Sequence, residues 1–83
     1  MIKYNEISHD GKTYEVRATI EDNRAMVGLF CGDKRASPVV YGVEIETYFD
    51  AKLRGFSLDL IDELMDQMER DLRSGRLKLF PSN

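Results

Sequence analysis

The sequence predicts an α+β domain in which a four-stranded antiparallel sheet is packed on one face by a single C-terminal helix. Strand-forming segments separated by turn residues occupy the first 48 positions, and the one long amphipathic helical pattern follows them. The length of 83 residues suits one compact domain, 1–83, whose core is close to the smallest that can stand alone. The expected order is ββββα, with a short fifth strand possible after the helix.

The helical pattern runs from residue 56 to residue 75. Ser57 is a good N-cap, and Phe56 with Ile61 has the spacing of a hydrophobic staple. Gly75 is suited to the left-handed conformation that ends many helices. The apolar residues recur every three or four positions, at Ile61, Leu64, Met65, Met68 and Leu72. This spacing places them on one stripe, which we expect to lie on the sheet.

Residues 2–7 and 13–20 read as two strands of a hairpin around the turn sequence His9-Asp10-Gly11. A three-residue loop would put Ile2 and Tyr4 on the same face as the apolar residues of the second strand. A two-residue Asp10-Gly11 loop would put Lys3 and Asn5 there instead. The three-residue loop with a glycine bulge is therefore the prediction.

Residues 25–31 form the third predicted strand, which is apolar on both faces and so is expected to be central or covered twice. Residues 32–38 are polar and turn-forming, and predict a surface loop. The fourth strand is predicted over 39–48, followed by a connection over 49–55 with a short helical turn near 51–53. Residues 76–80 are the candidate fifth strand. In the fourth strand, four residues are predicted to face the helix: Val39, Tyr41, Val43 and Ile45.

Composition limits the classes of function. Twelve Lys and Arg against 15 Asp and Glu give a net charge of −3, which argues against a general binder of nucleic acid or anionic membranes. A lone cysteine cannot form an internal disulfide, so nothing indicates an oxidising compartment. No apolar run approaches the roughly 20 residues of a membrane-spanning helix. A cytoplasmic location without membrane contact is the expectation.

The residue types that usually carry catalysis are scattered in this sequence. His9 is the only histidine and lies in a turn, whereas a metal site needs several converging ligands. Cys31 closes an apolar strand, which is an ordinary place for a buried small side chain. Glu44 and Glu46 alternate on the predicted fourth strand, as residues on a wet sheet face do. We therefore predict no catalytic residues, no metal, no cofactor and no enzymatic activity.

Two surfaces could bind a protein partner. Asp59, Asp62 and Asp66 form an acidic ridge on the helix that could dock a basic partner, although a solvated face would look the same. The second surface is the sheet face that the helix leaves open, where an apolar patch would mark an interface. It is predicted to contain Met26, Phe30 and Val40, with Ile7 or Tyr48 nearby. The alternative is that the segment 77–80 folds over this patch.

The predicted function is a small non-enzymatic interaction module that binds a protein partner and self-associates, as a homodimer, through the open sheet face or an edge strand. The alternative is a nucleic-acid-associated protein that uses a basic C-terminal end. In that reading five basic residues gather at one end of the molecule: Lys52, Arg54, Arg73, Arg76 and Lys78. Carboxylates on the same sheet face would repel the phosphates, so nucleic acid is the less favoured partner.

Overall fold

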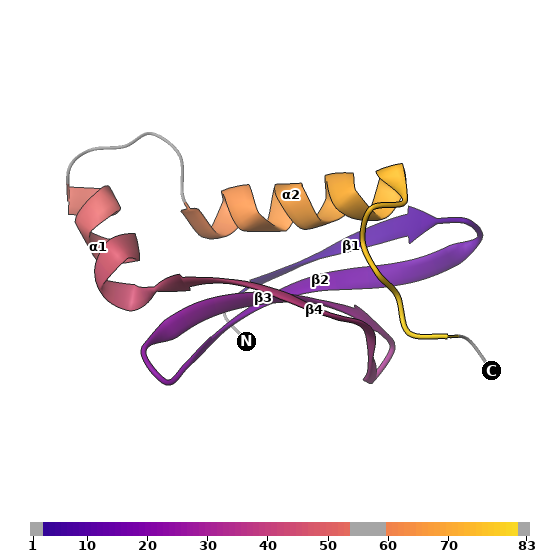
Figure 1. Cartoon of the computed structure of the whole chain (residues 1–83), viewed down its shortest axis with the longest axis horizontal. Coiled ribbons are helices and arrows are strands. Elements are labelled where there is room, and N and C mark those ends of the chain that lie inside the picture. The colour runs from indigo at the N-terminus through magenta and orange to yellow at the C-terminus, as the bar shows by residue number, and fades with distance from the viewer. Residues whose placement is uncertain (1–2, 54–59, 82–83) are drawn as a thin grey trace.

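The computed structural model describes residues 3–53 and 60–81, apart from the side chains of residues 51 and 52, and has the predicted α+β architecture (Figure 1). The elements are β1 (Lys3–His9), β2 (Lys12–Glu21), β3 (Arg24–Cys31), β4 (Lys34–Glu44), α1 (Ile45–Leu53) and α2 (Leu60–Ser74). The sheet is an antiparallel meander in the order β1-β2-β3-β4. Strand β3 is central, as its two apolar faces predicted.

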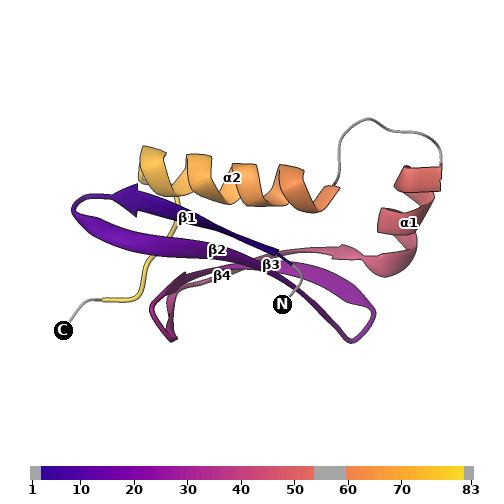
Figure 2. The same cartoon turned by 180° about the vertical axis from the view of Figure 1, so that it is seen from behind.

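Helix α2 lies along one face of the sheet, and α1 stands at one end of the molecule on that same side (Figures 1 and 2). No described helix covers the opposite face of the sheet, which is called the open face below. The core fills the space between α2 and the sheet. Its buried hydrophobic residues are Ile7, Tyr14, Val16, Ala18, Ala25, Val27, Leu29, Tyr48, Ile61, Met65, Met68, Leu72 and Leu77.

The predicted stripe on α2 is confirmed, because four of its five residues are buried and Leu64 is half-buried against the core. Gly75 ends the helix with φ of +79°. Its N–H donates to the carbonyl of Leu72, and the N–H of Arg76 donates to the carbonyl of Asp71. These two bonds are a Schellman motif, which satisfies carbonyls that a helix end leaves unpaired. The predicted cap, Phe56 and Ser57, lies outside the described residues.

The predicted register of the first hairpin is wrong. Its loop has two residues, Asp10 and Gly11, with φ of +51° and +76°, so that His9 pairs with Lys12. Both values suit the type I′ turn that matches the twist of the flanking strands. As a result Tyr4 faces the open side and is 54% exposed, whereas Ile7 pairs with Tyr14 and is buried in the core.

Polar residues of β1 are tolerated on the helix face because β1 is an edge strand. The ammonium of Lys3 reaches the carboxylate of Asp62 on α2, and both side chains are about half exposed. Long side chains at the rim of a core can keep their charged ends in water. The presence of Lys3 on the helix-facing side is therefore no reason to reject the two-residue loop.

The predicted loop over 32–38 is also largely strand. Gly32 takes φ of +63° in a two-residue turn, and Lys34 pairs directly with Cys31. The ladder between β3 and β4 is then interrupted, because Gly28 pairs with Val40 while Phe30 pairs with Arg35. The four residues 36–39 therefore lie opposite Leu29, in an enlarged bulge that accommodates the Pro38 ring at an edge.

Strand β4 ends at Glu44, and the predicted strand residues 45–48 belong to α1. Their β-branched and aromatic side chains resemble a strand, but Ile45 and Tyr48 fall three apart on one side of a helix. Tyr48 is buried there, and Ile45 packs on the core. Tertiary packing thus overrides local propensity in this segment. The prediction that Val39, Tyr41 and Val43 face the core is confirmed.

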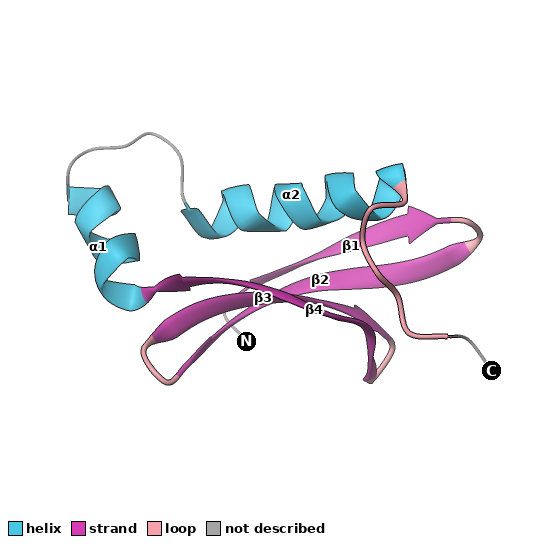
Figure 3. Ribbon diagram, viewed as in Figure 1, coloured by secondary structure: helices cyan, strands magenta, loops and turns pink. Residues whose placement is uncertain are grey.

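Residues 76–81 form no fifth strand, but they are attached to the first half of β4 (Figure 3). The N–H of Phe80 donates to the carbonyl of Ala36 at 2.9 Å, and the Ser37 hydroxyl donates to the carbonyl of Lys78. Leu77 is buried in the core. The tail therefore covers the edge of β4 near its start.

Candidate interaction surface

The second half of β4 has a free backbone edge, because none of the residues that the structure describes pairs with it. The N–H of Ile45 donates to the carbonyl of Asn23 in the β2–β3 turn, so Val43 and Tyr41 direct their polar groups toward β3. In an antiparallel ladder the residues between them direct theirs the other way. The N–H and C=O groups of Val40 and Gly42 consequently point out of the sheet, where a further strand could pair with them.

A groove lies beside this edge, between β4 and the flank of α2. Its volume is about 320 Å³, and its floor is formed by Gly42 and Val43. Leu60 and Leu64 supply apolar side chains from α2, and both are half-buried against the core. Three polar residues complete the lining: Glu63, Gln67 and Arg70. A strand added to β4 could place alternate side chains in such a groove.

A hydrogen-bonded chain fixes the polar wall of the groove to β4. The Tyr41 hydroxyl donates to the carboxylate of Asp71, and the side-chain amide of Gln67 donates to the same carboxylate at 2.9 Å. The guanidinium of Arg70 in turn donates to the amide oxygen of Gln67 at 2.8 Å. This chain holds Arg70 at the rim of the groove.

The chain also shifts two pKa values. Burial, together with the Asp71 carboxylate, raises the pKa of Tyr41 from 10.0 to about 12. The hydrogen bond from Tyr41 is the main reason that the pKa of Asp71 lies below its usual value of 3.8. Each group is held in its ordinary charge state, with tyrosine neutral and aspartate ionised.

We expect the Tyr41→Phe variant to lose stability only within a defined pH range. The lowered pKa of Asp71 stabilises the fold above the unfolded value of 3.8, and this contribution is lost as pH falls through the folded pKa. The raised pKa of Tyr41 stabilises the fold below pH 10.0, and this contribution is lost as pH rises toward 12. Urea titrations across pH should show the largest difference between wild type and variant near neutrality. A difference that does not change with pH would contradict this assignment.

The other edge of the sheet is strand β1, where charged side chains oppose pairing with a further strand. On β1, the carbonyl of Ser8 accepts a hydrogen bond from Arg73 at 3.3 Å. Lys3 lies on the same strand, and its ammonium forms an ion pair with the carboxylate of Asp62. Charged side chains at a sheet edge discourage pairing with another strand. The free backbone edge of β4 is therefore the better docking position.

On the open face, Met26 and Phe30 are half-buried and Val40 is 41% exposed. These three residues line a hollow of about 180 Å³ together with residues of β2, β3 and β4, and none of the described tail residues, 76–81, takes part. The guanidinium carbon of Arg17 lies 4.3 Å from the centre of the Phe30 ring. The predicted patch therefore exists, but Arg17 already covers part of it. Ile7 and Tyr48, predicted nearby, are buried in the core instead.

Two of the predicted acidic-ridge residues lie on the exposed side of α2. Asp62 is paired with Lys3, and Asp66 is exposed. Asp59 falls outside the described residues. Part of the ridge therefore stabilises the contact between α2 and β1.

The structure does not bring the predicted basic residues together. Arg73, Arg76 and Lys78 lie at the C-terminal end of α2, whereas α1, which carries Lys52, stands at the opposite end (Figure 1). Arg54 falls outside the described residues. Arg73 is also paired with Glu69 at 3.0 Å.

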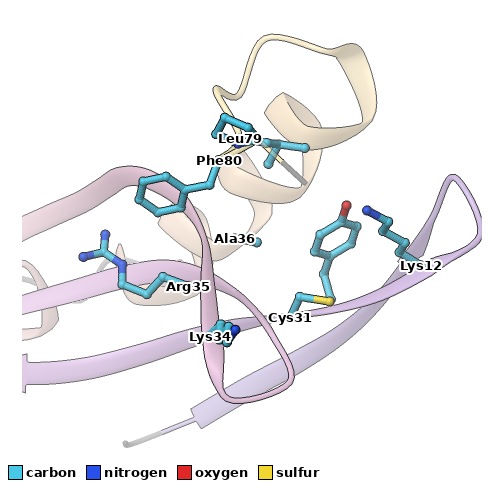
Figure 4. A pocket seen from close by; sticks show the side chains of 9 residues that line it. Lys12, Cys31, Lys34, Arg35, Ala36, Leu79 and Phe80 are labelled. Atoms are coloured by element: carbon cyan, nitrogen blue, oxygen red, sulfur yellow. The ribbon is translucent and has the colours of Figure 1, made fainter. Parts of the chain in front are cut away.

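A second basic cluster borders a hollow of about 490 Å³ between the β-hairpin turns and the tail. Lys12, Lys34 and Arg35 line it, with Leu79 and Phe80 from the tail (Figure 4). Arg35 points away from Lys12 in this view, because Arg35 pairs with Phe30 and faces the open side of the sheet. The cations therefore do not converge on one point.

The residues considered for chemistry stay apart. His9 contacts its neighbour Asp10 at 3.4 Å, and Cys31 is exposed beside Lys34. Glu44 is paired with Arg24 on the sheet, whereas Glu46 lies in α1, so the two carboxylates do not share a strand. Within the part of the chain that the structure describes, no group of three His, Cys, Asp or Glu residues could hold a metal ion. None of the described helices is long and apolar enough to cross a membrane.

The sequence did not indicate the groove beside β4. Gly42, Glu63 and Leu64 line it from two separate elements, and only the packing of α2 over the sheet brings them together. Comparisons of the chain with protein-family models, curated proteins and solved structures found no match.

Proposed function

We propose that this protein is a small interaction module that self-associates by adding a strand of a second copy to the free edge of β4. The supporting observation is that outward-pointing backbone groups at Val40 and Gly42 lie directly beside the groove under Leu60 and Leu64. Main-chain hydrogen bonds would supply affinity, and the groove would accept alternate side chains.

The edge is favoured over the open face for a physical reason. On the open face, Phe30 lies against Gly28 and under Arg17, so much of its apolar surface is already removed from water. At the edge, unpaired N–H and C=O groups gain bonds only from another strand or from water. A chain of this size gains stability from any extra burial that a dimer provides.

The Val40→Pro variant should weaken this association. Proline removes the outward N–H without breaking a bond to β3, and edge strands tolerate it. Losing one backbone bond per copy costs about 1 kcal/mol each, so the dissociation constant should rise by roughly 30-fold. Sedimentation at micromolar concentration measures it. The matched control is Glu6→Pro, which removes an outward N–H from the edge of β1 and should leave the dimer intact.

Phe30→Glu separates the two candidate surfaces. It should leave the dissociation constant unchanged if the edge is the interface, and should abolish the dimer if the open face is. A wild-type chain that sediments as a monomer at micromolar concentration would refute self-association altogether.

A further inference from the structure

We infer that the strand which a second copy adds to β4 is its own β4, antiparallel and centred on Gly42. This inference rests on the proposed self-association and specifies its geometry. In the resulting dimer the two sheets become one continuous eight-stranded sheet, with α2 of both copies on the same side.

The length of the free edge determines the centre. At one end Pro38 has no N–H to donate, and the tail already occupies the carbonyl of Ala36. At the other end α1 begins at Ile45. The outward groups between these limits belong to Val40, Gly42 and Glu44. A two-fold axis makes this segment pair with itself, so that Gly42 meets Gly42 and Val40 meets Glu44 of the second copy.

Glycine suits the position on the axis. The two residues on the axis are directly opposed across the pair of strands, and glycine places no side chains against each other there. A Cβ atom at Gly42 would lie 3.2 Å from Nη2 of Arg24, which is the mobile end of an exposed side chain. The position therefore has room for a small substituent, which makes it suitable for an engineered cysteine.

The groove beside β4 favours an antiparallel pairing of the two β4 strands over a parallel one. In this register Tyr41 of the second copy lies beside Val43, and both are on the helix-facing side of the sheet. The half-buried side chains of the two β4 strands thus meet beneath Leu60 and Leu64 of both α2 helices. A parallel pairing of the two edges would turn the second α2 to the opposite face and leave both grooves open.

The charges along the groove are self-complementary in the same orientation. Glu63 and Arg70 line one wall and are seven residues apart, which is about two helical turns or 10 Å. When the two helices run antiparallel, Glu63 of each copy lies toward Arg70 of the other. Electrostatic complementarity of this kind selects the partner and its orientation.

Disulfide trapping tests the register in a Cys31→Ser background, since Cys31 is exposed. Directly opposed residues of a hydrogen-bonded pair have Cα atoms about 5.5 Å apart, within the range for a disulfide. Gly42→Cys should therefore give a covalent dimer under mild oxidation. In Val40→Cys the two thiols would be offset by four residues, about 13 Å along the strands, and should not cross-link.

Three results would overturn the register: a cross-link at residue 40, equal cross-linking at residues 40 and 42, or no cross-link at residue 42 in a chain that still dimerises. Self-association itself would survive each of those results, because it is tested by Val40→Pro and by the wild-type sedimentation.

Charge reversal gives a second measurement without engineered thiols. Glu63→Arg and Arg70→Glu each place like charges across the axis, and each variant alone should dimerise at least tenfold more weakly. A mixture of the two restores both opposite pairs and should form a mixed dimer with wild-type affinity. Equal affinity for the mixture and the separate variants would overturn the proposed orientation.

Discussion

Truncation of Leu29 to alanine is expected to lower the free energy of unfolding by about 2 to 5 kcal/mol, the usual cost of removing a large aliphatic side chain from a core. Leu29 is fully buried on the interior strand β3, opposite the enlarged bulge of β4. The loss would be a large share of the roughly 5 to 15 kcal/mol that holds a small domain folded. Urea denaturation followed by circular dichroism measures it.

The matched control is Leu79→Ala, which removes the same atoms from a side chain that is 38% exposed. It should cost well under half as much, because less apolar surface returns to water. A loss of less than 1 kcal/mol for Leu29→Ala would mean that the space between the sheet and α2 is packed differently from the structure.

Replacement of Ser37 by alanine is expected to cost about 1 to 3 kcal/mol, because it leaves a part-buried carbonyl and a backbone N–H without their partner. Ser37 is fully buried and is the one buried residue of polar type among those that the structure describes. Its hydroxyl donates to the carbonyl of Lys78 and accepts from the N–H of Val39 at 3.1 Å. It therefore fastens the tail to the bulge of β4.

Hydrogen exchange gives this prediction a local readout. The N–H of Phe80, which bonds to Ala36, should exchange faster in Ser37→Ala, whereas amides in the β1–β2 ladder should follow only the global change. Ser8→Ala, at an exposed position, serves as the control. Unchanged protection of Phe80 would show that the tail is held by Leu77 and not by Ser37.

Much of the architecture could be predicted because it depends on local patterns. The stripe from Ile61 to Leu72 fixes the buried face of α2, and Gly75 marks its end, since both signals arise within a few residues. The apolar pattern of residues 25–31 places β3 at the centre of the sheet. These features need no knowledge of distant contacts.

The wrong predictions concern segments for which two backbone conformations have similar local free energy. Both loop lengths around Gly11 are compatible with the turn residues, and burial of Ile7 beside Tyr14 selects the shorter one. The segment from Ile45 to Tyr48 suits either a strand or a helix, and the space for Tyr48 at the end of the core selects the helix. In both cases a long-range contact decides between alternatives that the local sequence leaves nearly equal.

The sequence by itself determined the fold class and the helix face that is buried, because the spacing of apolar side chains dictates which surface leaves water. It also indicated that one sheet face would be open. Only the tertiary structure decided that the tail and Arg73 protect other parts of the sheet edges while Val40 and Gly42 remain accessible beside an apolar groove. That surface is built from β4 and α2, whose relative position follows from packing across the whole core and not from either segment alone.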